Sequence, residues 1–225
     1  METIAYIDGY NLYYGRLRKS SFKWIDVVSL VKKICIVQNP STNLIKVKYF
    51  TAPVRANFAS HGQQSSQSQN TYHNALKKLN GDMIEIINGY HTVEKGTPPI
   101  YQKPIDRKQT VDVWKFEEKQ TDVNIAMHMY RDALQLGISQ LVLVSNDSDL
   151  ESALKFIKED FNIQIGLIIP KKENKDHYTS RPVTKYLDQY SDWTRKHILD
   201  DECKKSLMPD TIPTSKKPIR KPDYW

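Results

Sequence analysis

Carboxylates that could bind a metal ion stand where two apolar runs end. Asp147 and Asp149 follow the apolar residues 141–144, and Asp8 ends the apolar residues 4–7. If both runs are parallel strands of an open α/β sheet, their carboxyl ends converge on one crevice. Carboxylates that meet there repel one another unless a cation lies between them. The spacing therefore predicts a divalent metal site, with magnesium or manganese as the ion because oxygen ligands suit these ions better than zinc.

A further acid, Asp122, has two interpretations. Thr121 is predicted to cap a helix, which places Asp122 in the first helical turn. A carboxylate in that turn is stabilised by the helix dipole and needs no other function. The alternative is that Asp122 joins the predicted metal site.

The same question applies to Asp147 and Asp149. Ser148 and Glu151 have the spacing of a capping box, so both aspartates could serve only to start a helix. Asp8 differs, because no helix signal follows it directly. Acids at three strand-to-helix junctions, all expected at one edge of the sheet, favour the metal site over three independent caps.

The elements that must position these acids follow from the hydrophobic pattern. Short apolar or β-branched runs predict strands at residues 3–7, 45–51, 83–87, 141–145 and 163–169. Helical periodicity predicts helices at residues 25–37, 71–79, 121–136 and 150–160. This alternation predicts an α/β fold with a mostly parallel sheet and helices on both faces.

Two segments interrupt the alternation. Residues 56–70 are polar and are predicted to form a flexible loop. Residues 91–114 combine prolines with basic residues and aromatic rings, and are predicted to form a long excursion such as a hairpin, which either contacts nucleic acid or packs on the domain. The candidate phosphate-binding residues here and just beyond are Lys103, Arg107, Lys108, Lys115 and Lys119.

Composition, charge and cysteine use predict the domain division, the partner and the cellular location. We expect one domain over residues 1–200 and a basic, proline-rich extension over residues 201–225, which wraps the domain or follows a polyanion. The formal net charge of +7 suits a polyanionic partner. Cys35 and Cys203 match no metal-binding spacing, and with no leader or membrane-spanning run they favour the reducing cytoplasm.

Three segments together resemble the signatures of the NYN domain, in its LabA-like branch, within the PIN-like nuclease superfamily. These segments are Tyr6-Ile7-Asp8-Gly9-Tyr10-Asn11, Glu118-Lys119-Gln120-Thr121-Asp122-Val123-Asn124-Ile125-Ala126 and Leu143-Val144-Ser145-Asn146-Asp147-Ser148-Asp149-Leu150. The resemblance implies a Rossmann-like, PIN-type three-layer α/β/α sandwich and a metal-dependent ribonuclease, most simply an endoribonuclease. Carried over by position, the metal ligands and catalytic acids would be Asp8, Asp122, Asp147 and Asp149, supported by Asn11, Ser145 and Asn146.

Two positions depart from the family pattern. Asn146 stands where glycine is frequent, and His128 stands where many members carry a further acid. If His128 thins the acidic cluster, a second metal ion would bind weakly or not at all.

Other functions remain open at this stage. The main alternative is an RNA-binding or regulatory module that keeps the acidic pocket without turnover, and a homodimer is compatible with either function. A phosphatase of the haloacid dehalogenase type would need a second acid where Tyr10 stands. An oxidoreductase with a nucleotide cofactor is disfavoured, because no G-x-G-x-x-G follows the first predicted strand.

Overall fold

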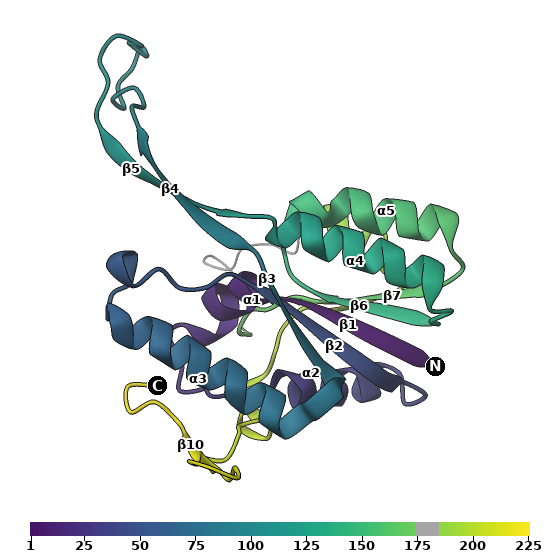
Figure 1. Ribbon diagram of the computed structural model, residues 1–225. Coiled ribbons are helices and arrows are strands. Elements are labelled where there is room, and N and C mark those ends of the chain that lie inside the picture. Colours follow the sequence, from purple (N-terminus) through teal and green to yellow (C-terminus); the bar gives the residue numbers. More distant parts are fainter. Residues whose placement is uncertain (174–184) are drawn as a thin grey trace.

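The computed structural model describes residues 1–173 and 185–225 and is built around a six-stranded sheet with the order β3-β2-β1-β6-β7-β8 (Figure 1). All neighbouring strands of this sheet pair in parallel. Its strands are β1 (Glu2–Asp8), β2 (Asn43–Thr51), β3 (Ile84–Asn88), β6 (Gln140–Val144), β7 (Gln164–Ile168) and β8 (Trp193–Arg195). The five strands expected from the sequence are confirmed, and β8 is an addition.

Helices cover both faces of the sheet and complete the predicted three-layer sandwich. One face is covered by α2 (Val27–Gln38) and α3 (Gln63–Asn80), and the other by α4 (Thr121–Gln135) and α5 (Glu151–Asp160) (Figure 1). The shorter helical segments are α1 (Gly9–Leu12), η1 (Tyr13–Leu17), η2 (Ala56–Phe58), η3 (Gly81–Met83), η4 (Ser148–Leu150), α6 (Lys185–Asp188) and α7 (Asp200–Lys204). Among the described residues, no helix is long and apolar enough to cross a membrane.

The strand order reverses beside β1. From β1 the chain builds outward through β2 and β3, then returns to place β6 on the other side of β1. Ligands of open α/β sheets bind at the carboxyl ends of strands where the order reverses in this way. The loops that follow β1 and β6 therefore occupy the position where a site is expected.

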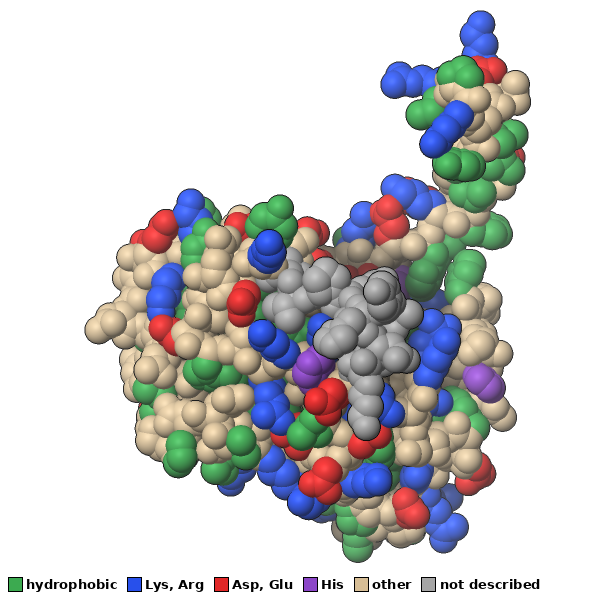
Figure 2. Space-filling model, turned by 180° about the vertical axis from the view of Figure 1, so that it is seen from behind, with side chains coloured by type: hydrophobic (Ala, Val, Ile, Leu, Met, Phe, Trp, Pro, Cys, Tyr) green, Lys and Arg blue, Asp and Glu red, His purple; other side chains and the backbone are tan. Residues whose placement is uncertain are grey.

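A long hairpin, here called the arm, projects from this same edge (Figures 1 and 2). Its strands are β4 (Tyr90–Gly96) and β5 (Val113–Lys119), which pair antiparallel from Tyr90 opposite Lys119 to Gly96 opposite Val113. The long excursion expected at residues 91–114 is a hairpin, and its second strand runs on to Lys119.

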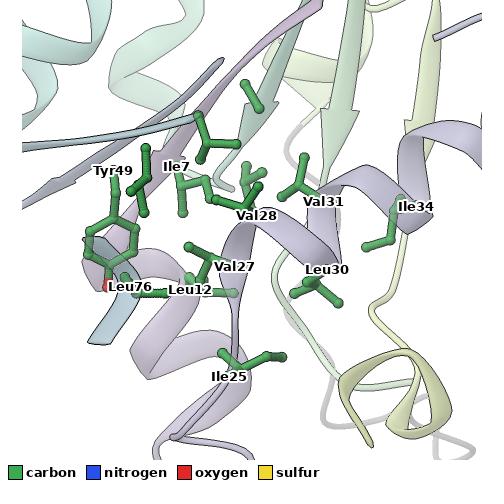
Figure 3. Close-up of a cluster of buried hydrophobic side chains, with 14 of the residues drawn as sticks. Ile7, Leu12, Ile25, Val27, Val28, Leu30, Val31, Ile34, Tyr49 and Leu76 are labelled. Carbon is green, nitrogen blue, oxygen red and sulfur yellow. The ribbon is translucent and has the colours of Figure 1, made fainter. Parts of the chain in front are cut away.

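The core follows from the two-residue period of the strands. Ala5 and Ile7 of β1 point to the layer that contains α2 and α3, and Ile4 and Tyr6 point to the layer of α4 and α5. Figure 3 shows Ile7 among side chains of α2 in the first of these layers. Because both faces are covered, the strands are continuous apolar runs, which made them readable in the sequence.

The predicted loop at residues 56–70 is wrong. η2 occupies part of it, and α3 begins at Gln63 rather than at residue 71. The buried face of α3 comprises Ser68, Tyr72, Ala75 and Leu76, so its first turns carry no apolar residue that could mark a helical period. Tertiary contacts hold this end: the Gln69 amide donates to Ala52 O and accepts from Val54 N.

The C-terminal residues lie against the α2 and α3 layer. They include the two-stranded ribbon of β9 (Thr211–Ile212) and β10 (Ile219–Arg220). The Trp225 ring lies 6.2 Å from that of Trp24 and 5.5 Å from that of Tyr72. The division into a domain of residues 1–200 and an extension of residues 201–225 stays a prediction.

Both cysteines, Cys35 and Cys203, are free and buried.

Candidate metal centre

Asp8 is the last residue of β1 and faces the point where the strand order reverses. The residue is 2% exposed, and its Oδ1 accepts a hydrogen bond from Asn11 N at 2.9 Å. Asp8 is thus the cap of α1, which corrects the expectation that no helix follows it. Gly9 is required next, because a Cβ there would lie 2.6 Å from Phe50 O.

Hydrogen bonds join the loop after β1 to the loop after β6. Asp8 Oδ2 accepts from Asn11 Nδ2 at 2.7 Å and from Ser145 Oγ at 3.0 Å. Asn11 Oδ1 accepts from Asn146 N at 3.2 Å, and Ser145 Oγ accepts from Asp147 N at 3.1 Å. The residues predicted to support the site therefore orient Asp8 and the backbone of Asp147.

Asp147 also has a capping role. Its Oδ1 accepts from Asp149 N at 3.1 Å, so Asp147 caps η4 and the predicted capping box of Ser148 and Glu151 is wrong. The short η4 turn intervenes before α5 begins at Glu151. A cap and a metal ligand are compatible functions for one aspartate, because each needs one carboxylate oxygen.

Asp122 is brought to the same place by the start of α4. The helix begins at Thr121 and its cap is Gln120, which has a φ of 76°, so the expectation that Thr121 is the cap is wrong by one residue. The Glu118 carboxylate accepts from Thr121 N at 3.2 Å and from the Thr121 hydroxyl. The predicted location of Asp122 in the first turn is confirmed.

Three of the four acids named from the sequence converge. Asp8, Asp122 and Asp147 each place one carboxylate oxygen so that the three oxygens lie within 4.8 Å of one another. Asp149, the fourth, lies in η4 outside this three-acid group. A donor set of carboxylate oxygens fits a hard divalent cation such as Mg²⁺ or Mn²⁺.

The electrostatics of the group agree with a cation site. Burial raises the pKa of Asp122, and the charges of Asp8 and Asp147 add to that effect, so the pKa reaches about 6. Burial also raises the pKa of Asp8, although hydrogen bonds from Asn11 and Ser145 oppose this rise. Carboxylates held together at this cost in the metal-free protein are stabilised when a cation neutralises them.

His128 lies apart from the three-acid group. Its Nδ1 is 3.2 Å from Lys48 Nζ, and its ring meets Phe50 edge-on. Lys48 in turn pairs with Asp132 at 2.6 Å beneath α4. This buried pair was not found in the sequence, because it depends on the packing of α4 on β2.

The five basic residues named from the sequence are divided along the arm. Lys115 and Lys119 lie on β5, where each pairs with Glu117. Lys103, Arg107 and Lys108 lie between β4 and β5, toward the tip of the arm and away from the sheet.

Comparison with known proteins shows which family and which proteins this chain resembles. The family model described as "NYN domain" matches residues 3–193. A protein of Pseudomonas putida named 6-hydroxy-3-succinoylpyridine 3-monooxygenase HspA is 35% identical over 243 residues, which covers 100% of this chain and 75% of that protein. A solved structure of a protein of unknown function from Vibrio parahaemolyticus is 17% identical with a TM-score of 0.49, covering 89% of this chain and 94% of that one.

Proposed function

The chain belongs to the NYN domain family, within the PIN-like nuclease superfamily, and we propose that it is a divalent-metal-dependent ribonuclease, most simply an endoribonuclease. The observation that carries this proposal is the convergence of Asp8, Asp122 and Asp147 at the reversal of strand order, with carboxylate oxygens within 4.8 Å. NYN domains bind RNA, so the substrate is taken to be RNA.

Each acid has a separate task in this proposal. Asp8 and Asp147 would hold Mg²⁺ or Mn²⁺ directly, and Asp122 would complete the ligand set. Asp149, two residues after Asp147, would orient water molecules at the rim of the three-acid group. Asn11, Ser145 and Asn146 fix the Asp8 carboxylate and the loop of Asp147 through the hydrogen bonds described above. When bound, the metal ion lowers the pKa of a water molecule and stabilises charge on the attacked phosphate.

RNA would be held on the arm side of the site. Lys103, Arg107 and Lys108 at the tip and Lys115 and Lys119 on β5 supply positive charge for flanking phosphates. Lys115 and Lys119 each have a carboxylate partner in Glu117, which RNA would have to compete with. The tip residues are therefore the stronger candidates of the five.

A second candidate follows from the relative named as a monooxygenase. Its identity of 35% extends over the whole of this chain, so the same pocket could hydroxylate a pyridine ring. Such a reaction places one atom of O₂ in the product and reduces the other to water with two electrons from a reductant such as NADH. Non-haem iron oxygenases ordinarily use two histidines and one carboxylate, and the three-acid group of the described residues contains no histidine. That donor set favours the nuclease.

One pair of assays separates the two candidates. Labelled single-stranded and structured RNAs are incubated with the protein in Mn²⁺, Mg²⁺ or EDTA, and oxygen and NADH consumption are followed in parallel with a hydroxypyridine. The nuclease proposal expects RNA fragments in Mn²⁺ or Mg²⁺ and none in EDTA. Oxygen consumption coupled to pyridine hydroxylation, without RNA fragments, would establish the monooxygenase instead. RNA binding without cleavage in any buffer would favour the non-catalytic module.

Three finer assignments are part of this proposal. They are membership of the LabA-like branch, a cytoplasmic location and a homodimer. The first rests on the three sequence segments quoted above and the second on two free cysteines.

A further inference from the structure

Aromatic rings form a series that starts beside the three-acid group. Tyr10, two residues after Asp8, stacks on Tyr14 with ring centroids 6.1 Å apart and planes inclined by 8°. On its other side Tyr10 meets the His91 ring edge-on at 5.9 Å, and its hydroxyl lies 2.9 Å from His91 Nε2. His91 belongs to β4, so the series passes from the site directly to the arm.

The series then continues outward along the arm. The His91 ring stacks on Phe116 of β5 at 4.5 Å, and Phe116 stacks on Phe58 of η2 at 5.3 Å. Phe58 meets Trp114 edge-on at 6.3 Å. We call this series the aromatic track; in spatial order its members are Tyr14, Tyr10, His91, Phe116, Phe58 and Trp114.

Most rings of the aromatic track face solvent. Tyr14 is 58% exposed, Phe58 45%, Phe116 42% and Trp114 73%, whereas His91 is buried. The buried His91, hydrogen-bonded to the Tyr10 hydroxyl, anchors these exposed rings, and Trp114 is the most exposed of them. Contiguous exposed apolar surface of this kind marks an interaction site.

The arm separates its aromatic residues from the two lysines paired with Glu117, whereas Lys95, which pairs with Asp112, lies on the aromatic side. In the register of the hairpin, Phe116 lies opposite Val93 and Trp114 lies opposite Lys95, so these four side chains share one face. The lysines paired with Glu117 alternate with them along β5 and lie on the other face. The face of the arm that continues to the three-acid group is therefore the aromatic one.

Cations accompany the aromatic track. The Arg18 guanidinium lies 5.1 Å from the centre of the Tyr14 ring, and Arg55 donates to His91 O at 3.1 Å. Figure 2 shows hydrophobic side chains along the stem of the arm, with Lys and Arg gathered at its tip. Exposed rings with adjacent cations characterise binding sites for single-stranded nucleic acid, where bases stack and phosphates pair with the charges.

We propose that the aromatic track binds unpaired bases of single-stranded RNA and leads the strand along the arm to the three-acid group. This inference rests on the proposed ribonuclease function and adds the strandedness of the substrate and the residues that hold it. Paired bases cannot present their faces to Trp114, so a duplex gains nothing from the track. The competing occupant of the same face, a second copy of this chain, is an outcome of the test.

The test measures binding without cleavage. Fluorescence anisotropy with a labelled single-stranded oligoribonucleotide in EDTA gives the Kd of the wild-type protein and of Trp114→Ala. We expect Trp114→Ala to bind about 5-fold to 100-fold more weakly, the range for loss of one stacked base. Trp114→Phe should restore most of the affinity. Phe156→Ala, which removes an exposed ring of α5 outside the track, should bind as the wild type does.

A second experiment shows whether an RNA base is the partner of the Trp114 ring. Abasic nucleotides are placed one at a time along the oligoribonucleotide. At one position the abasic RNA should bind the wild type and Trp114→Ala with nearly equal Kd, because the stacking pair is already missing. An effect of Trp114→Ala that is the same at every abasic position would overturn base stacking at Trp114.

Other outcomes are equally decisive. Equal Kd values for the wild type and Trp114→Ala overturn the track, and a lower molecular mass of Trp114→Ala in light scattering would then assign the aromatic face to a contact between copies. Cleavage by the wild type with a KM that Trp114→Ala leaves unchanged overturns the track but not the ribonuclease. Base-dependent binding without any cleavage overturns the ribonuclease but not the track. No RNA binding by the wild-type protein overturns both.

Discussion

The Ser145 hydroxyl donates a hydrogen bond to Asp8 Oδ2 at 3.0 Å, across the point where the strand order of the sheet reverses. Ser145 Oγ in turn accepts a hydrogen bond from Asp147 N at 3.1 Å. Ser145 is completely buried, so no water replaces either bond when it is lost. One hydroxyl therefore orients two of the three acids that the proposal assigns to the metal ion.

Ser145→Ala should weaken metal binding without removing a ligand. Loss of a group that orients a metal ligand typically costs 10-fold to 100-fold in affinity, and we expect about that loss for Mn²⁺. Calorimetric titration with Mn²⁺ measures it, and excess Mn²⁺ should restore the cleavage rate. Ser152→Ala, on the exposed side of α5, is the control. Unchanged Mn²⁺ affinity in Ser145→Ala would contradict a metal bound through Asp8.

Asp122→Asn should stabilise the metal-free protein at neutral pH. The pKa of an aspartate in an unfolded chain is about 4, whereas burial and neighbouring charges raise the pKa of Asp122 to about 6 in the folded protein. Its stabilising contribution is thus complete below pH about 4 and is lost as the pH rises through about 6. With allowance for solvent screening at this partly buried group, the gain of the variant is on the order of 1 kcal/mol, or a Tm higher by about 2–4 °C at pH 8.

Thermal unfolding in EDTA at pH 4 and pH 8 measures this effect. The gain should appear at pH 8 and vanish at pH 4, and Glu159→Gln should show neither. Added Mn²⁺ should raise the Tm of the wild type more than that of Asp122→Asn, because the variant lacks a ligand. A lower Tm for Asp122→Asn at pH 8 in EDTA would show that the carboxylate stabilises the metal-free fold.

The buried pair of Lys48 and Asp132 should matter for stability rather than for chemistry. Asp132 Oδ2 lies 2.6 Å from Lys48 Nζ and accepts from the Tyr6 hydroxyl at 2.7 Å. Lys48→Met leaves this carboxylate buried with one partner fewer, and we expect a loss of about 3–5 kcal/mol in the free energy of unfolding. Urea unfolding measures it. Lys155→Met, which breaks an exposed pair with Glu159, should cost less than about 1 kcal/mol.

The basic tip of the arm should contribute phosphate contacts. Combined replacement of Lys103, Arg107 and Lys108 by alanine should weaken RNA binding and reduce its dependence on salt. The slope of log Kd against log salt should fall by about 0.7 for each lost contact with single-stranded RNA, hence by about 2 for three. Lys77→Ala, Lys78→Ala and Lys155→Ala together remove the same charge from body helices, and an equal change there would contradict a specific role for the tip.

Parallel strands made much of the fold and the acid positions predictable. Their buried β-branched runs are visible in the sequence, and their carboxyl ends must share one edge. That rule alone places Asp8 and Asp147 together. Asp149 was expected with them because two residues of one loop cannot be ranked without knowing the backbone path of η4.

Features that depend on contacts between distant segments were not predictable. The cap of Asp8 on α1 needs the local backbone angles, and the polar start of α3 is held by Gln69 reaching Val54 and Ala52. The aromatic track joins α1, η1, η2 and the arm, and its order depends on how these distant segments pack together. No periodicity within any one of these segments could have revealed it.

The most direct test of the metal-site account is the single-turnover rate of RNA cleavage by Asp147→Asn in Mn²⁺, beside the Mn²⁺ affinity of the same protein. Asparagine keeps the acceptor that caps η4, so the fold should persist while a charged ligand is lost. We expect the rate to fall by at least about 100-fold, since a direct ligand should matter no less than the groups that orient it. Mn²⁺ affinity should fall with it, and the Tm in EDTA should be no lower than that of the wild type, because the repulsion within the three-acid group is reduced. Wild-type cleavage and Mn²⁺ affinity in Asp147→Asn would contradict the account.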